Sequence, residues 1–224
     1  MLSESEQDYL KSIYKLQKGR EPVTSVSTNM LAEEMKVAAA SVTNMLKNLA
    51  EMKLVRYIPY QGVQLTAEGE QIALEVIRHH RLVELYLAQA LGVPWDQVHQ
   101  EAEKWEHVVS RDIASKMDEA LGFPTTDPHG QPIPNSNGTI SQAQTIRLDQ
   151  LEPEQNAVII EVNDHSPDLL RYLADLGLIP QTRISILTRE PFNGPITLRV
   201  NRKKCSIGTE VASHIFVTRL ESRK

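Results

Sequence analysis

Cysteine is almost missing from this chain, and so are several other features that identify common classes of protein. The single cysteine, Cys205, excludes an internal disulfide and a cysteine-rich zinc module. No apolar run approaches the roughly 20 residues of a membrane-spanning helix, and the opening MLSESEQDYL does not follow the basic-then-apolar plan of a signal peptide. An HExxH motif and a glycine-rich phosphate loop are also missing. We therefore expect a cytoplasmic protein that has no membrane partner, and the missing motifs argue against an enzyme of these two classes.

The composition supports packed cores but not a strongly basic surface. Hydrophobic residues make up 41% of the 224 residues and charged residues 24%, which is typical of a folded chain with two or three modules. The formal net charge is −5, and this acidity argues mildly against constitutive nucleic-acid binding. DNA binding by this chain would therefore need local basic groups or a bound cation.

The residue pattern changes twice along the chain. Residues 5–121 are helix-rich, with a short β-like stretch near 54–65, and residues 122–150 are rich in Pro, Gly, Asn, Ser and Thr, as in a linker. Short β segments follow, namely AVIIEV, RISILT, ITLRV and IFVTRL, with one helix around PDLLRYLADLG that Gly177 would cap. The pattern predicts a mainly α fold that ends in a small β-barrel.

The first module has the pattern of a winged helix-turn-helix. SEQDYLKSIYKLQ predicts a first helix, and STNMLAEEMKVAAASVTNMLKNLAEM predicts two more helices with a tight turn near Val37. LVRYIPYQGVQLT then predicts two strands around a turn at Gln61 and Gly62, which would form the wing, and Thr66 would cap the next helix. Helix-turn-helix geometry also occurs in proteins that never bind DNA, but the wing favours DNA binding.

The third helix of this module is the expected recognition helix. Its apolar residues would pack against the preceding helix and leave small hydroxyl and amide side chains exposed. Such side chains can approach base edges and phosphates in the major groove. The candidate DNA-contacting residues are Ser41, Thr43, Asn44 and Lys47.

The stretch VHQEAEKWEHV carries two imidazoles and two carboxylates at helical spacing. At 100° per residue, the side chains of His99, Glu103, Glu106 and His107 would lie within about a 100° arc of one helix. Ala102, Trp105, Val108 and Val109 would face a core on the opposite side. This donor set suits a divalent first-row metal, whereas the alternative interpretation is a solvated polar stripe. A second pair, His80 and Glu84 at i and i+4, favours the metal.

The order of these motifs resembles the family of metal-dependent transcriptional regulators that includes the diphtheria toxin repressor and the manganese transport regulator. The resemblance covers essentially the whole chain, including QDYLKSIYKL, LTAEGE, PHGQPIP and a C-terminal module similar to the family's SH3-like (FeoA-like) domain. It implies a winged helix-turn-helix domain (1–72), a helical metal-binding and dimerisation domain (73–124), a linker (125–149) and an SH3-like domain (150–224). It also implies a homodimer, formed through the middle helices, whose binding to double-stranded operator DNA is promoted by metal.

The same resemblance implies two metal sites. The main site would use Asp8, Glu103, Glu106 and His107, and the ancillary site would use His80, Glu84 and His99. His79 precedes the matching histidine and is expected at the surface. A cation in the main site would attach the first helix to the dimerisation helices and so fix the distance between the two recognition helices of the dimer.

Four positions differ between branches of this family or from its usual pattern. Asp8 and Glu103 stand where iron-responsive relatives have methionine and cysteine, and hard carboxylates favour Mn²⁺, with Fe²⁺ acceptable and Co²⁺ or Zn²⁺ as substitutes in vitro. Lys11 stands where the manganese branch typically has an acidic residue, and a charged lysine cannot be a ligand, which argues against a closely spaced two-metal cluster. Lys53 replaces a usual glycine, which predicts an uncommon backbone conformation or a longer helix.

The resemblance thus implies a repressor that senses Mn²⁺ or Fe²⁺ and controls metal-transport and metal-homeostasis genes. The residues alone leave two alternatives open. A winged-helix regulator that senses an organic ligand would have an apolar pocket and would bind DNA in the presence of a chelator. A metallohydrolase would show metal-dependent hydrolysis of esters, peptides or phosphoesters.

Overall fold

The computed structural model describes residues 2–19, 22–141, 143–163 and 166–220, and it forms two compact units. The first unit contains residues 1–80, 105–109 and 134–139, and the second contains residues 81–104, 110–133 and 140–224. Within the part of the chain that is described, no helix is both long enough and apolar enough to cross a membrane.

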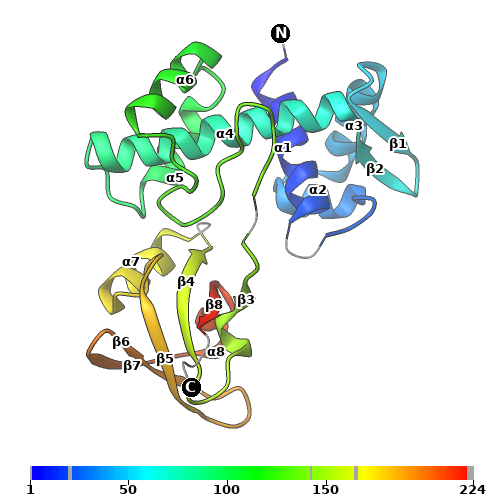
Figure 1. Cartoon of the computed structure of the whole chain (residues 1–224). Helices are drawn as coiled ribbons and strands as arrows, with labels where there is room; N and C mark the ends of the chain where they lie inside the picture. Colours follow the sequence, from blue (N-terminus) through cyan, green and yellow to red (C-terminus); the bar gives the residue numbers. More distant parts are fainter. Residues whose placement is uncertain (1, 20–21, 142, 164–165, 221–224) are drawn as a thin grey trace. The chain divides into compact units, whose positions relative to one another are not determined.

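The first unit contains the predicted winged helix-turn-helix. Helix α1 (Glu4–Lys18) is followed by α2 (Thr28–Glu34), α3 (Ala39–Glu51) and an antiparallel hairpin of β1 (Val55–Ile58) and β2 (Gly62–Leu65) (Figure 1). A capping box starts α1, because the Ser3 side chain accepts from the Glu6 backbone N–H and the Glu6 carboxylate accepts from Ser3. Tyr9, Leu10 and Ile13 of α1 pack with apolar residues of α2, α3 and the hairpin in one core. The helix-turn-helix and the wing are confirmed.

Two tight turns in this unit need special backbone geometry. Lys53, after α3, has a φ of 61°, so the expected uncommon conformation is present at this position. Gly62 opens β2 with a φ of 98°, and a Cβ at this position would lie 2.6 Å from the Val26 carbonyl oxygen. The close approach has a structural purpose, since Val26 and Val63 exchange backbone hydrogen bonds and attach the loop after α1 to the wing.

Three helices of the middle region are α4 (Ala67–Ala90), α5 (Val98–Trp105) and α6 (Arg111–Ala120). The Thr66 hydroxyl accepts from the backbone N–H of Gly69, which confirms the predicted cap of α4. Helix α4 is buried on more than one side, and His79 is only 7% exposed. The expectation that His79 lies at the surface was therefore wrong, because a central helix has no fully solvated face.

The C-terminal module of the second unit is the predicted SH3-like domain. Its antiparallel sheet has the strand order β3-β8-β4-β5-β6-β7, and Figure 1 shows these strands from light green to red. The strands are β3 (Ile146–Arg147), β4 (Asn156–Val162), β5 (Arg183–Arg189), β6 (Ile196–Val200), β7 (Lys203–Ile207) and β8 (Ile215–Leu220). A 3-10 turn (Leu148–Gln150) and helices α7 (Pro167–Leu176) and α8 (Thr209–Ser213) complete it. Gly177, with a φ of 72°, caps α7 as predicted.

Candidate metal centre and recognition helix

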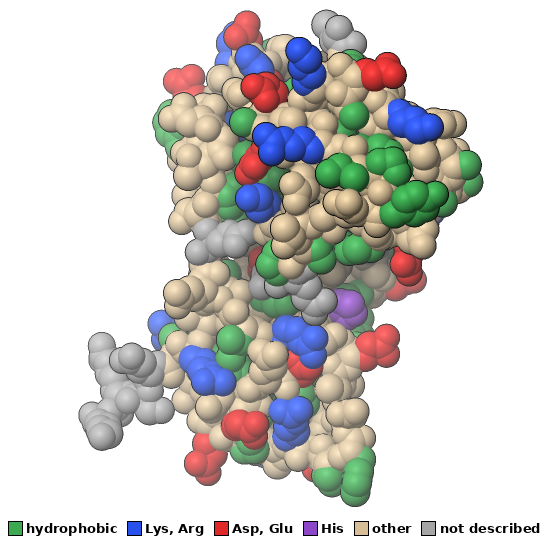
Figure 2. Space-filling model, turned by 90° about the vertical axis from the view of Figure 1, so that its right-hand side faces the viewer, with side chains coloured by type: hydrophobic (Ala, Val, Ile, Leu, Met, Phe, Trp, Pro, Cys, Tyr) green, Lys and Arg blue, Asp and Glu red, His purple; other side chains and the backbone are tan. Residues whose placement is uncertain are grey.

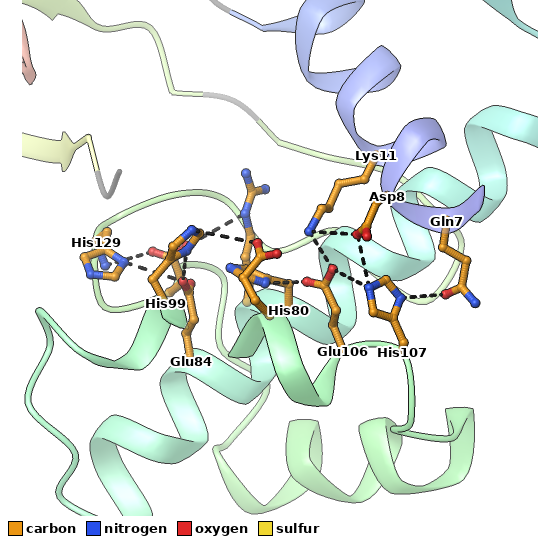
Figure 3. A network of polar contacts seen from close by, with 12 residues as sticks. Gln7, Asp8, Lys11, His80, Glu84, His99, Glu106, His107 and His129 are labelled. Atoms are coloured by element: carbon orange, nitrogen blue, oxygen red, sulfur yellow. Dashed lines mark hydrogen bonds and ion pairs between the residues drawn. The ribbon is translucent and has the colours of Figure 1, made fainter. Parts of the chain in front are cut away.

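A buried network of charged side chains occupies the first unit. Asp8 and Lys11 come from α1, His80 comes from α4, and Glu106 and His107 come from the turn after α5 (Figure 3). Nζ of Lys11 donates to Oε1 of Glu106 at 2.5 Å, and Nδ1 of His80 donates to Oε2 of the same carboxylate. Nε2 of His107 lies 3.1 Å from Oδ1 of Asp8 and 3.2 Å from Oε1 of Glu106. Residues distant in sequence therefore converge on one carboxylate.

The turn that carries Glu106 and His107 was predicted incorrectly. The sequence indicated one helix through VHQEAEKWEHV, but α5 ends at Trp105, and the backbone N–H groups of Val108 and Val109 both donate to the Trp105 carbonyl oxygen. Ser110 then caps α6 by accepting from the Ile113 N–H. Because the helix stops, the expected faces are not kept: Val108 is 73% exposed, whereas Glu106 is 1% exposed.

The charge on Glu106 is maintained by its neighbours. Desolvation by burial is the largest single influence and raises its pKa, but the hydrogen bond from His80 and the positive charge of Lys11 together outweigh it. The pKa of Glu106 is therefore lowered from its ordinary value, and the side chain is an anion. One of its oxygens accepts from Lys11 and the other accepts from His80.

Gln7 determines how His107 is presented, and sequence reasoning missed it. Oε1 of Gln7 lies 3.1 Å from Nδ1 of His107 and accepts a hydrogen bond from its N–H (Figure 3). That bond leaves Nε2, on the side of Asp8 and Glu106, as the atom available to a cation. One ligand atom from each of Asp8, Glu106 and His107 lies within 4.8 Å of the others. The position of Gln7 beside Asp8 could have suggested this role, but an amide adjacent to a candidate ligand is a weak signal.

A separate polar network lies in the second unit. Oε1 of Glu84 accepts from Nδ1 of His99 at 3.0 Å, and Nε2 of His99 lies 3.8 Å from the carboxylate of Glu103, one turn along α5. Glu84 thus contacts His99, its predicted partner, while His80 belongs to the first unit and contacts Glu106. Asp127 and His129 of this unit are also buried, and neither was predicted as a site residue.

The recognition helix α3 presents polar side chains to solvent. Ser41, Asn44 and Lys47 are exposed, whereas Val42, Leu46 and Leu49 are buried in the core. Thr43 is half-buried, and its hydroxyl donates to the Ala39 carbonyl oxygen at 3.0 Å. This helix also has a contact that sequence reasoning missed, because the amide of Asn48 donates to the Glu6 carboxylate of α1 at 2.8 Å. On the face drawn in Figure 2, basic and acidic side chains are interspersed and little histidine is visible.

Comparisons with known proteins find matches to each part of the chain. Three family models match in order: iron dependent repressor, N-terminal DNA binding domain, over residues 1–63; iron dependent repressor, metal binding and dimerisation domain, over residues 66–135; and FeoA domain, over residues 146–219. The iron-dependent repressor IdeR of Mycobacterium leprae (strain TN) is 29% identical over 224 residues, which is 95% of this chain and 96% of that protein.

Two further matches are closer in identity. The diphtheria toxin repressor of Corynebacterium efficiens is 32% identical over 185 residues, which is 80% of this chain and 75% of that protein. A solved structure of a manganese-dependent transcriptional repressor in complex with manganese matches with a TM-score of 0.87 and 36% identity, over 96% of this chain and 100% of the other. With its DNA-binding domain, its metal-binding and dimerisation domain and its FeoA-type domain, the chain belongs to the iron-dependent repressor family and is a metal-dependent transcriptional repressor rather than an enzyme.

Proposed function

We propose that this repressor responds mainly to Mn²⁺ and that its main metal site consists of Asp8, Glu103, Glu106 and His107. The observation that carries the proposal is the cluster of Asp8, Glu106 and His107, whose ligand atoms lie within 4.8 Å of one another. Oxygen and imidazole donors without a thiolate suit Mn²⁺, and Fe²⁺ binds the same donor types. The similar manganese-bound repressor supports the choice of Mn²⁺.

The residues present fit such an ion chemically. Glu106 is ionised and buried, and His107 directs Nε2 toward the same space as two carboxylates. Glu103 is exposed and contacts His99 at 3.8 Å, so its part in the main site is a prediction based on the family's ligand pattern. A bound divalent cation would neutralise the carboxylates and would be held jointly by α1 and by the turn after α5.

The positions of the proposed ligands explain how metal binding can affect DNA binding. Asp8 lies on α1, which also supports the recognition helix through the Glu6–Asn48 hydrogen bond. The turn with Glu106 and His107 directly precedes α6 and lies within the region matched by the metal-binding and dimerisation domain. A ligand set shared by these two segments links ion binding to the position of the DNA-binding helices.

We further propose that the operator-binding form is a homodimer and that Ser41, Thr43, Asn44 and Lys47 contact DNA. Ser41, Asn44 and Lys47 are exposed on α3, and the dimerisation domain supplies the expected protein interface. The ancillary site would be formed by His80, Glu84 and His99, and the hydrogen bond between Glu84 and His99 supports the pairing of two of these residues.

Operator binding measured against free Mn²⁺, Fe²⁺, Co²⁺ and Zn²⁺ tests the proposal, with the operator found by selection from random DNA. We expect strong binding with Mn²⁺, loss of binding in a chelator, and recovery when Mn²⁺ is restored. Binding that persists unchanged in a chelator would contradict metal sensing and would favour a regulator of another ligand class. Analytical ultracentrifugation of the same samples checks the dimer.

A further inference from the structure

One surface of the C-terminal module is strongly basic. Strands β5, β6 and β7, together with the turn at residues 201–202, contain six basic residues and no acidic residue, although the whole chain has a net charge of −5. Arg189, one of the six, lies 4.0 Å from Glu152. The other five are exposed and have no ion pair among the described residues, and we call them the basic surface: Arg183, Arg199, Arg202, Lys203 and Lys204. Positive charge gathered in this way on an acidic chain indicates an anionic partner.

The register of the strands places these basic residues next to one another. The residues of β5, β6 and β7 that face the core are buried, so the residues between them face outward. On this outward face, Arg199 of β6 lies directly opposite Lys204 of β7. Arg183 of β5 comes two residues before Ser185, the strand partner of Arg199, so it is a diagonal neighbour on the same face. Strand β7 is the last strand of the sheet, and the basic surface therefore extends to the sheet edge (Figure 1).

The pairing of Arg199 with Lys204 is unfavourable in the free protein. Like charges directly opposite each other on neighbouring strands repel and reduce the stability of a sheet. Both side chains are exposed, so the core does not require them, and neither has an ion pair within the part of the chain that the structure describes. A bound anion would remove this repulsion. The arrangement is therefore better suited to binding an anion than to stabilising the sheet.

We propose that the basic surface is a second DNA-binding surface of this repressor, which contacts the phosphate backbone of duplex DNA. Neighbouring strands are about 4.8 Å apart, so three strands span about 10 Å. Duplex DNA carries one charge per about 1.7 Å and therefore about six charges over that length. An extended acidic peptide carries at most one charge per about 3.3 Å and matches the density of cations less well. Phosphate contacts carry no sequence information, so base reading is left to α3.

The proposal rests on DNA binding, which the match to the N-terminal DNA-binding domain supports, and not on the choice of Mn²⁺. It adds a contact that the winged helix-turn-helix does not supply, because the basic surface lies within the region matched by the FeoA domain. It also gives a reason for the charge distribution, since an acidic chain needs local basic groups to approach DNA.

The test compares the full wild-type chain with the double variant Arg199→Gln and Lys204→Gln, in the presence of whichever metal ion activates the wild type. Binding is measured on a duplex with the operator between long random flanks, and on random duplex alone, at several salt concentrations. We expect the variant to bind several-fold more weakly at low salt and to flatten the slope of log K against log salt by about 1 to 2. The ratio of operator binding to random binding should stay the same, because only phosphate contacts are lost.

The matched control is the double variant Lys104→Gln and Arg147→Gln. It removes the same charge from exposed residues of the same unit, but these two side chains are paired with Glu101 and Asp149. The control should keep the wild-type slope. An equal flattening in the control would show a general effect of net charge and would overturn the proposal.

Lys204→Glu supplies a second measurement, because it places a carboxylate directly opposite Arg199. The new pair of opposite charges should raise the urea concentration at the midpoint of unfolding, while the lost cation should weaken DNA binding. A change in both directions at once cannot come from damage to the fold.

Equal affinities and slopes in the wild type and in the Arg199→Gln and Lys204→Gln variant would overturn the proposal. A variant that keeps its DNA affinity but changes its oligomeric state in analytical ultracentrifugation would also overturn it and would assign the basic surface to contact with a second copy of the chain. Neither result would affect metal-dependent operator binding. A wild type that binds operator equally well with and without metal would contradict the proposed function, and the salt dependence on random DNA would still test the basic surface.

Discussion

Nζ of Lys11 lies 2.5 Å from Oε1 of Glu106 and 3.7 Å from Oδ1 of Asp8, so a lysine ammonium neutralises the carboxylates that are proposed to bind metal. Lys11 is only 5% exposed, and a buried charge of this kind interacts strongly with its neighbours. In the metal-free protein, Lys11 therefore supplies part of the positive charge that a cation would otherwise supply. A metal ion bound at the proposed main site would have to compete with this internal cation for Oε1 of Glu106.

Lys11→Met is expected to lower the Mn²⁺ concentration for half-maximal operator binding by about tenfold or more, because the competing charge is removed. The metal-free variant should also be less stable than the wild type, by about 3 kcal/mol, because Glu106 loses a buried partner. Mn²⁺ titrations of operator binding and chemical unfolding in a chelator measure the two effects. Lys15→Met, one turn further along α1, is the control and should change neither. Weaker Mn²⁺ activation in Lys11→Met would mean that Lys11 assists metal binding instead of opposing it.

Because the pKa of Glu106 is lowered in the folded chain, the stability of the fold should depend on pH. A carboxyl whose pKa is lower in the folded chain than in the unfolded chain stabilises the fold above its unfolded pKa, and this contribution is lost as the pH falls through the folded pKa. The ordinary pKa of a glutamate side chain is 4.5. The stabilisation by Glu106 should therefore be complete near neutral pH and should decline as the pH falls below 4.5. Urea unfolding of the metal-free wild type and of Glu106→Gln, between about pH 7 and pH 3.5, measures the difference. A difference that does not change with pH would show that Glu106 contributes by packing alone.

Asp8 links α1 to His107, and Asp8→Ala should leave folding nearly intact while raising the Mn²⁺ needed for operator binding. The reason is that Asp8 is the one proposed main-site metal ligand that lies in the winged helix-turn-helix domain. Glu4→Ala, which removes an exposed carboxylate from the first turn of the same helix, is the control. The clamp mechanism is wrong if Asp8→Ala binds operator with an unchanged metal dependence.

Asn44 and Lys47 should differ in what they contribute to DNA binding. Asn44→Ala should cost about 1–3 kcal/mol at the operator, because an amide that faces a base edge is lost. Lys47→Ala should weaken specific and random DNA alike and flatten the salt dependence, as expected for a phosphate contact. Binding isotherms on operator and random DNA at several salt concentrations separate these effects. Equal losses on both DNAs for Asn44→Ala would remove it from the base-reading residues.

Much of the fold was predictable because it follows local periodicity. Tyr9, Leu10 and Ile13 repeat at helical spacing and are buried, and the β segments around Ile159, Ile186 and Leu198 are short apolar runs that form the second core. Strand β7 (Lys203–Ile207) was not predicted, because KKCSI has little apolar alternation and pairs with β6 through its backbone. The end of α5 at Trp105 was also missed, because the spacing of VHQEAEKWEHV remains helical through His107.

The candidate site was predictable in its residue types but not in its contacts. The sequence spacing predicted Glu106 and His107 as candidate metal ligands. The roles of Lys11 and Gln7, however, depend on the packing of α1 beside a turn that is about a hundred residues away in the chain. The same limit applies to His129, which stands in a loop far from Glu84 in sequence. Pairings of this kind are set by tertiary packing, and local patterns carry no information about them.

Replacing the hard ligands should change the choice of metal. Glu103→Cys should shift activation from Mn²⁺ toward Fe²⁺, Co²⁺ and Zn²⁺, because thiolate is softer and bonds those ions more strongly. Asp8→Met should act in the same direction, and the double variant should shift further, although one shared ion makes strict additivity unexpected. Operator binding across the metal series, with anaerobic handling, measures the ranking. Glu101→Cys is the matched control, since Glu101 lies on α5 and pairs with Lys104 at 2.7 Å.

The Glu101→Cys control should keep the wild-type ranking, which would show that a thiol elsewhere on α5 is not sufficient to change it. An unchanged ranking in the Glu103→Cys and Asp8→Met double variant would have a different meaning. Selectivity would then be set by groups that these substitutions leave in place, and Lys11 is the first to test because it already contacts Glu106. Adding Lys11→Met to the double variant separates the two cases: a shift that appears only in the triple variant would show that the lysine charge, rather than ligand softness, controls which ion is accepted.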